Sequence, residues 1–139
     1  MSTIKSHRDL EAWQFAMDTV IETYRITENF PPSEIYGLRS QMRRAAVSVP
    51  SNVAEGQARP LVAAANHCSI ALGSLAELDT QVEAAVRLRL LSEERVREFR
   101  RLHESTTRLV AGLRRSKLSQ SGAVATGIFL LGLAVGILR

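Results

Sequence analysis

The sequence of 139 residues contains few aromatic residues and a single cysteine. Aromatic side chains make up 5% of the chain, whereas apolar residues of all kinds make up 45%, with Ala and Leu prominent among them. This composition is typical of closely packed helices and disfavours a β-sandwich, and no stretch alternates polar and apolar residues as a strand does. The lone Cys68 excludes an internal disulfide framework and fits a reducing cytoplasm.

The residue sets of common catalytic and metal sites are also missing. A di-metal site in a helical bundle needs Glu-x-x-His pairs, and none of the three histidines follows a Glu at that spacing. Cys68 adjoins His67, which places the two side chains about 100° apart on a helix, so Cys68 is better interpreted as a small core residue than as a nucleophile. No Gly-rich phosphate loop, H-E-x-x-H or G-x-S-x-G motif occurs. We therefore expect no enzyme, no metal and no cofactor.

The charge balance is modestly basic, with a formal net charge of +4 and a pI of about 10.0. The excess lies in residues 61–117, which hold ten Lys and Arg against seven Asp and Glu. Such an excess permits nucleic acid or an anionic membrane surface as a partner without requiring either. The first 25 residues are charged and amphipathic, unlike a signal peptide, so a cytoplasmic location is expected.

Apolar residues recur at three- and four-residue steps in four segments of residues 1–117. This pattern predicts an antiparallel up-and-down four-helix bundle with short connections. The first helix is expected to follow Asp9 as its N-cap, with a buried stripe of Leu10, Trp13, Met17, Val20, Ile21 and Tyr24. The third, over residues 62–90, should bury Ala64, Cys68, Ala71, Leu75, Leu78, Val82 and Ala85. The fourth, after Ser92, should bury Val96, Phe99, Leu102, Thr106, Leu109, Val110 and Leu113.

The second helix contains a proline inside its apolar pattern. Pro50 has no N–H to donate to Ala46, yet Val53 returns to the apolar stripe, which favours a kinked, continuous helix that stops near Gly56. Asn52 is expected to bond the carbonyls that Pro50 frees, Glu55 to pair with an arginine, and Gly56 to supply the helix end. The alternative is that Asn52, Glu55 and Gly56 contact a ligand or an interface.

Gly73 interrupts the third helix at a cost of about 1 kcal/mol relative to Ala. We expect it to allow a close backbone approach to Ala45 and Ala46 of the second helix.

Three groups of residues resemble one bacterial protein family. The main signature is Tyr36-Gly37-Leu38, Gln41, Arg43-Arg44-Ala45, Ser48, Pro50-Ser51-Asn52 and Ala54-Glu55-Gly56. The other two are Asp9-Leu10 with Ala12-Trp13-Gln14 and Phe30-Pro31, and Gly73-Ser74-Leu75 with Glu77-Leu78 and Gln81. Over residues 7–115 this order resembles the four-helix-bundle family named after the 23S rRNA intervening-sequence protein. The resemblance implies a non-enzymatic, ring-like homo-oligomer, a pentamer by expectation. A related accessory protein of diversity-generating retroelements is basic, pentameric and a partner of a reverse transcriptase and nucleic acid.

Arginines gather on two of the predicted helices. They are Arg39, Arg43, Arg44 and Arg59 on or just after the second helix, with Arg97 and Arg101 on the fourth. One interpretation is a solvated face with salt bridges, and the other is a phosphate-binding surface for RNA or DNA. Because no aromatic residues alternate with these arginines, such contact would be electrostatic rather than base-specific.

Residues 118–139 form an apolar tail. No charge occurs in the 21 residues from Leu118 to Leu138, and Gly132 and Gly136 form a G-x-x-x-G pair. The 16 residues 123–138 would span about 24 Å as a helix, short of the roughly 30 Å of a bilayer core. Arg114, Arg115 and Lys117 precede the tail as a cytoplasmic flank would. An extra apolar helix is predicted, as a membrane anchor or as a packing helix, with an unordered extension as the third interpretation.

Two functional hypotheses follow. The first is a non-enzymatic, homo-oligomeric helical scaffold or adaptor that contacts RNA or DNA through its arginines. The alternative is a tail-anchored protein, held at the inner membrane by residues 123–138, whose bundle faces the cytoplasm.

Overall fold

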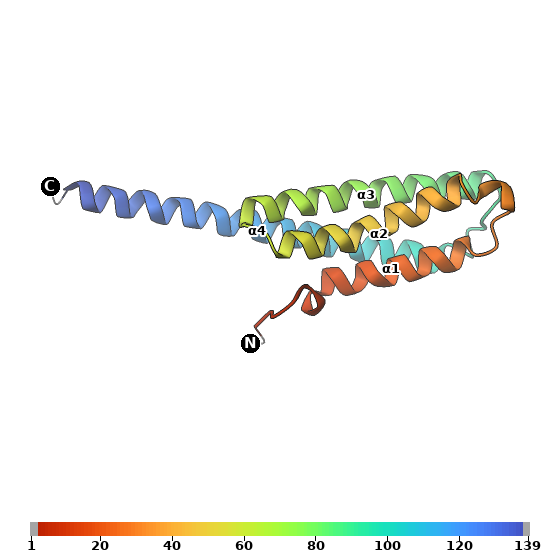
Figure 1. Cartoon of the computed structure of the whole chain (residues 1–139), viewed down its shortest axis with the longest axis horizontal. Helices are drawn as coiled ribbons and strands as arrows, with labels where there is room; N and C mark the ends of the chain where they lie inside the picture. Colours follow the sequence, from red (N-terminus) through yellow and green to blue (C-terminus); the bar gives the residue numbers. More distant parts are fainter. Residues whose placement is uncertain (1–2, 138–139) are drawn as a thin grey trace.

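The computed structural model describes residues 3–137, and the regular structure of this part of the chain is entirely helical. Its four α-helices are α1 (Glu11–Thr27), α2 (Leu38–Gln57), α3 (Leu61–Arg87) and α4 (Arg97–Ile137), with short 3-10 helices η1 (His7–Asp9) and η2 (Pro32–Glu34). α2 packs against α1 and α3, and α4 packs against the same two helices (Figure 1). The predicted all-α, antiparallel four-helix bundle is confirmed.

The core contains the apolar stripes that the sequence predicts on α3 and α4. All seven α3 positions are buried, and Cys68 among them is 2% exposed. Val96, just before α4, is buried, as are Phe99, Leu102, Thr106 and Val110 on α4, with Leu109 and Leu113 partly buried beside them. α2 contributes Met42, Ala45, Ala46, Val49 and Val53. Small and medium side chains dominate this list, which fits the low aromatic content.

The buried face of α1 differs from the predicted one. Ile21 and Tyr24, expected in the core, are 65% and 43% exposed. The buried positions are Ala12, Ala16, Thr19, Val20, Glu22, Thr23, Ile26 and Thr27. Each of the three threonine hydroxyls donates to the carbonyl four residues earlier, at 2.7 to 2.9 Å. Because these hydroxyls bond within their own helix, threonine can occupy core positions that sequence patterns assign to larger apolar residues.

The start of α1 was also predicted wrongly. Asp9 is not its N-cap but lies in η1, where the carboxylate accepts hydrogen bonds from the backbone N–H groups of Lys5 and Ser6 at 2.9 and 3.0 Å. Leu10 occupies the N-cap position of α1 without a side-chain cap. Asp9 therefore orders the segment before the helix.

α2 continues through Pro50 and ends at Gln57, as the sequence predicts. The expected partner of the freed Ala46 carbonyl is wrong, because the amide of Asn52 donates to the Ser48 carbonyl at 2.8 Å. Ser51 donates to the Val47 carbonyl at 2.8 Å. These side chains thus bond the carbonyls four residues before themselves, which is the reach of a short polar residue on a helix.

The close approach between α2 and α3 occurs at Gly56 and not, as predicted, at Gly73. Gly73 is exposed, and a Cβ there would meet no atom within 4 Å, so its expected approach to α2 is wrong. The buried seam of α3 passes instead through Ala71 and Leu75, which leaves Gly73 on the solvent side. A Cβ at Gly56 would lie 3.0 Å from the Cβ of His67 and 3.2 Å from the Ala64 carbonyl oxygen. Gly56 is therefore the close approach between α2 and α3, inside the last turn rather than beyond it.

α4 is longer than the helices it packs against. The apolar tail is not a separate helix but the direct continuation of α4, which leaves the bundle and runs on alone (Figure 1). We call the described residues 118–137 the α4 extension. Two helices, α3 and α4, are long and apolar enough to cross a membrane. In the most apolar 18-residue segment of α3, 39% is buried inside the bundle, whereas none of the corresponding segment of α4 is buried.

Candidate functional site

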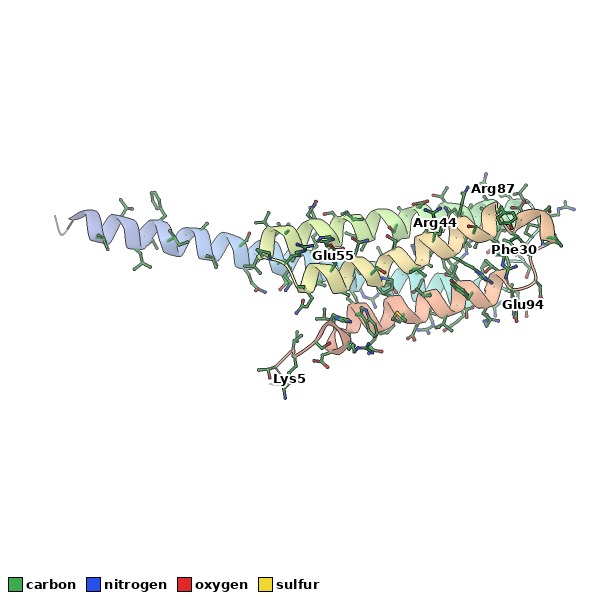
Figure 2. The ribbon with its side chains drawn as sticks, in the orientation of Figure 1. Lys5, Phe30, Arg44, Glu55, Arg87 and Glu94 are labelled. Carbon is green, nitrogen blue, oxygen red and sulfur yellow. The ribbon has the colours of Figure 1, made fainter. Side chains whose placement is uncertain are left out.

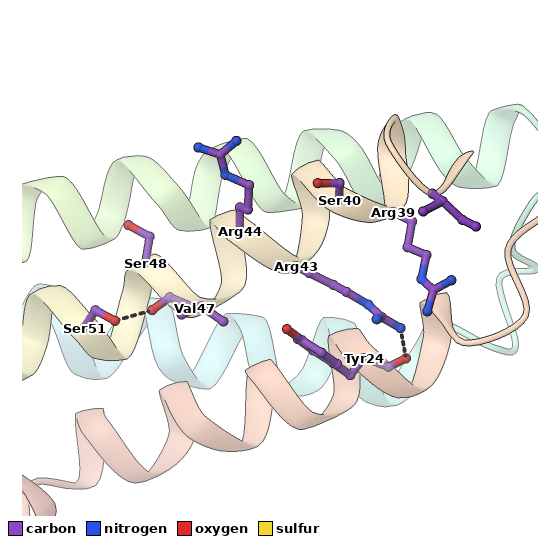
Figure 3. Close-up of a pocket in the computed structure, with 9 residues that line it drawn as sticks. Tyr24, Arg39, Ser40, Arg43, Arg44, Val47, Ser48 and Ser51 are labelled. Carbon is purple, nitrogen blue, oxygen red and sulfur yellow. Dashed lines mark hydrogen bonds between the residues drawn. The ribbon is translucent and has the colours of Figure 1, made fainter. Parts of the chain in front are cut away.

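An open groove of about 670 Å³ collects three of the predicted arginines. It is lined by Tyr24 of α1, Ile35, and the α2 residues Arg39, Ser40, Arg43, Arg44, Val47, Ser48 and Ser51 (Figure 3). We call it the arginine groove. Its α2 residues recur at three- and four-residue steps, so they follow one side of that helix. Its lining includes no carboxylate, which leaves the positive charge of the groove uncompensated from within.

Arg43 is held in place at the α1 side of the groove. Its guanidinium lies 4.2 Å from the centre of the Tyr24 ring, a cation–π contact. Its Nε donates to the Thr27 hydroxyl at 3.0 Å, and a terminal nitrogen donates to the Tyr24 carbonyl at 3.4 Å (Figure 3). Arg43 therefore fixes the groove wall and keeps a positive charge there.

Arg39 and Arg44 have no hydrogen-bond or ion-pair partner among residues 3–137. In Figure 3 Arg39 lies on the α1 side of α2, whereas Arg44 points toward α3. Arg44 also borders a neighbouring hollow that contains Ser74 and Glu77. Two guanidiniums with free donors, beside the Ser40 and Ser48 hydroxyls, provide what an oxyanion such as phosphate binds.

The other predicted arginines are placed differently. Arg59, just after α2, pairs with Glu55 at 3.1 Å, as expected of Glu55. Arg101 pairs with Glu98 on its own helix at 2.6 Å. Arg97 lines a separate hollow between α1 and the start of α4, together with Glu94 and Glu98. Arg59 and Arg101 are thus paired with carboxylates, and all three arginines lie outside the arginine groove.

Tyr24 is the groove residue that sequence reasoning missed, because its spacing assigned it to the core of α1. An aromatic ring does lie beside the arginines, but it comes from another helix and not from the arginine-bearing segment. The signal that could have found it is the threonine spacing of α1, Thr19, Thr23 and Thr27, which competes with Tyr24 for the buried face.

The Asn52–Glu55–Gly56 group forms part of a polar ladder between α2 and α3. Ser74 and Ser48 hydroxyls lie 2.8 Å apart, the Asn52 amide lies 3.1 Å from the Ser48 hydroxyl, and Asn52 Oδ1 lies 3.0 Å from His67 Nδ1. Because Asn52 Oδ1 can only accept, His67 Nδ1 must carry the proton. His67 Nε2 ends 3.8 Å from Glu55. Each member has a partner within the fold, so the ladder serves to align two helices.

Cys68 lies next to this ladder but turns into the core. Burial raises the pKa of its thiol, which keeps the reactive thiolate scarce. Its neighbour His67 is engaged with Asn52. Among residues 3–137 no group of three or more His, Cys, Asp or Glu side chains is placed to hold a metal ion.

The chain matches a known protein family over most of its length. The model of the family described as 23S rRNA-intervening sequence protein matches residues 8–112, which include all of α1, α2 and α3 and residues 97–112 of α4. No curated protein matches the chain closely enough to count as a relative.

Proposed function

Because the chain belongs to the 23S rRNA-intervening sequence protein family, we propose that it is a non-enzymatic, homo-oligomeric scaffold or adaptor that holds RNA or DNA. The arginine groove is the observation that supports this proposal. Among the described residues, no carboxylate lies within 4.0 Å of Arg39 or Arg44, so no internal ion pair neutralises these two guanidinium groups. They are therefore available to bind phosphate.

Phosphate contacts explain the proposed binding better than base contacts. The Tyr24 ring already faces Arg43, and the groove is open rather than shaped as a base pocket. Binding by guanidinium groups along an open surface depends on counterion release, so it is sensitive to salt and tolerant of sequence. We therefore expect affinity for single strands of mixed sequence.

The experiment measures binding of the full chain to mixed-sequence single-stranded RNA and DNA at about 50 mM salt. The double variant Arg39→Gln/Arg44→Gln removes two free guanidiniums and should weaken binding about ten-fold. It should also reduce the slope of log affinity against log salt by about 1.4, because each lost single-strand phosphate contact contributes about 0.7.

The matched control is Arg87→Gln/Arg101→Gln. It removes the same charge from arginines that pair with Glu83 and Glu98. Its affinity should stay within about two-fold of wild type, because paired surface arginines have less to gain from phosphate. Equal losses in both variants, or no binding by the wild type at low salt, would contradict the role of the groove.

Self-association is the second part of the proposal. A small apolar groove between α1 and α2 is lined by Trp13, Met17, Val20, Val47, Pro50, Ser51 and Ala54. Ile21 is 65% exposed on α1. Exposed apolar surface of this kind marks protein contacts, and a second copy of the chain is the occupant we propose.

Oligomeric mass tests this part directly. Light scattering of the full chain in mild detergent should give a mass of several copies, with five as the expectation from the family resemblance. Ile21→Glu should lower that mass, whereas Glu28→Gln, a change at an exposed residue just after α1, should not. A wild-type monomer would rule out the oligomer.

A further inference from the structure

The α4 extension exposes apolar side chains in every direction. The consecutive residues Ile128, Phe129, Leu130 and Leu131 are 67, 68, 61 and 68% exposed. Successive residues on a helix point about 100° apart, so these four surround the helix axis. A single partner helix would cover only one stripe of such a surface, whereas a lipid bilayer covers all of it.

We propose that the α4 extension crosses a lipid bilayer and holds the bundle upright on the membrane surface. This goes beyond binding by the bundle, because it adds a second partner, the acyl chains and anionic headgroups of a membrane. The described residues 118–137 are an uncharged, continuous helix of 20 residues, which corresponds to about 30 Å, close to the roughly 30 Å of a hydrocarbon core.

The polar groups inside the run are compatible with lipid. The Ser121 hydroxyl donates to the Leu118 carbonyl at 3.0 Å, and the Thr126 hydroxyl donates to the Gly122 carbonyl at 3.0 Å. The backbone is continuous α-helix to Ile137, so its amide groups bond within the segment. The Ser121 and Thr126 hydroxyls and the helical backbone therefore need no water, and the other polar side chains, Ser119 and Gln120, lie at the headgroup end of the run.

The charges at the base of the extension fit anionic headgroups. Arg114 and Arg115 are exposed and Lys117 is half-buried, directly before the uncharged run. Lys5 and the Glu55–Arg59 pair lie toward the same end of the bundle (Figure 2). A cluster of cations beside a spanning helix attracts anionic lipid and keeps this flank on its side of the membrane.

The continuity of α4 also places the arginine groove. From Lys117 back to Arg97 the helix covers about 30 Å, so the start of α4 would stand about that far from the headgroups. Figure 2 shows Arg44 farther from the extension than Glu55. The groove is thus lifted away from the lipid and left open to a soluble polyanion.

The first test reconstitutes the full chain with vesicles of phosphatidylcholine and phosphatidylglycerol by detergent removal. The wild type should float with the vesicles and stay with them in alkaline carbonate. Leu130→Arg/Leu131→Arg should reduce the floating fraction by about 100-fold, since each arginine is strongly disfavoured at bilayer depth. The control Leu88→Arg changes an exposed leucine of the bundle and should float normally. Flotation of the double variant, or release of the wild type by carbonate, would overturn the proposal.

The second test asks what covers Phe129. The chain has one tryptophan, Trp13, which packs in the bundle, so the wild type serves as its own reference. In vesicles with lipids brominated at mid-chain, Phe129→Trp should add a strongly quenched emission, while Trp13 stays unquenched. An unquenched new tryptophan would mean that copies of the protein, and not lipid, surround the extension, and would overturn the proposal.

Discussion

Gly56 lies where α2 and α3 pack with no space for a side chain. Its missing Cβ would press on the backbone carbonyl of Ala64 at 3.2 Å, and backbone cannot rotate away as a side chain can. Gly73, in the middle of α3, has open space where its Cβ would be. Packing between the helices therefore requires glycine at position 56, whereas at position 73 glycine only costs conformational entropy on folding.

Alanine at these two positions should have opposite effects. Gly73→Ala should raise the free energy of unfolding by about 1 kcal/mol, because it removes the helix penalty of glycine without a clash. Gly56→Ala should lower it by about 1–3 kcal/mol through overpacking. Thermal and denaturant unfolding followed by circular dichroism measures both, and a destabilised Gly73→Ala would show that something covers this side of α3.

Glu83 of α3 contacts two arginines, Arg87 on its own helix and Arg100 on α4. Hydrogen bonds from Arg87 at 2.8 Å and Arg100 at 3.2 Å hold the pKa of its carboxyl below the ordinary 4.5. Because the folded pKa is the lower one, the carboxylate stabilises the fold above about pH 4.5, and this contribution is lost as the pH falls through the folded pKa.

Glu83→Gln should therefore melt below wild type near about pH 6 and approach it as the pH falls toward about 3. Melting temperatures across this range provide the measurement. A difference that grows toward acid would contradict the sign derived from the two arginine contacts.

At the scale of elements, α2 and α3 are joined by a polar ladder rather than by apolar contact alone. Asn52 occupies its centre, donating to the Ser48 carbonyl and accepting from His67. Both contacts are half-buried, so the groups left behind by truncation would be poorly solvated.

Asn52→Ala should lower the free energy of unfolding by about 1–3 kcal/mol, because it leaves His67 Nδ1 without its acceptor. Ser51→Ala is the matched control, since that hydroxyl is exposed and bonds only its own helix. Equal effects of the two variants would indicate that the ladder adds nothing beyond helix propensity.

The elements themselves could be predicted from sequence better than their contacts. All seven core positions that periodicity predicts on α3 are buried, although Ala65, Ser74 and Gln81 are buried as well, and Val53 correctly indicates that α2 continues past Pro50. The pattern fails on α1 because hydroxyl groups satisfied within the helix make threonine a core residue. It also fails to bring Tyr24 to Arg43, since that contact joins residues on two helices and depends on how those helices pack. The sequence identified Arg39, Arg43 and Arg44 as candidate contacts. It did not predict that, of the six candidate arginines, only these three line a common groove.

At the scale of the whole molecule, the length of the apolar part sets a preference among membranes. The apolar residues 123–137 cover about 22 Å of helix, whereas the polar helical turn from Ser119 to Ser121 suits the headgroup region. Thinner bilayers should therefore accept the extension more readily. We expect a larger floating fraction of the wild type with myristoleoyl than with oleoyl phosphatidylcholine, measured at equal lipid. A preference for the longer lipid would indicate that the polar turn is itself immersed.

The backbone of α4 is continuous helix across Lys117 and Leu118, so the bundle and the α4 extension rotate together as one rigid unit. Because the helix is continuous, the face of the α4 extension that contacts a neighbouring copy also sets the direction in which the arginine groove of the bundle faces. Inserting one alanine after Gln120 would rotate the bundle by about 100° relative to the rest of the extension and move it about 1.5 Å farther away. Four inserted alanines would nearly restore the original orientation. The avidity of the membrane-bound oligomer for nucleic acid would then rise and fall with insert length, with the period of the α-helix.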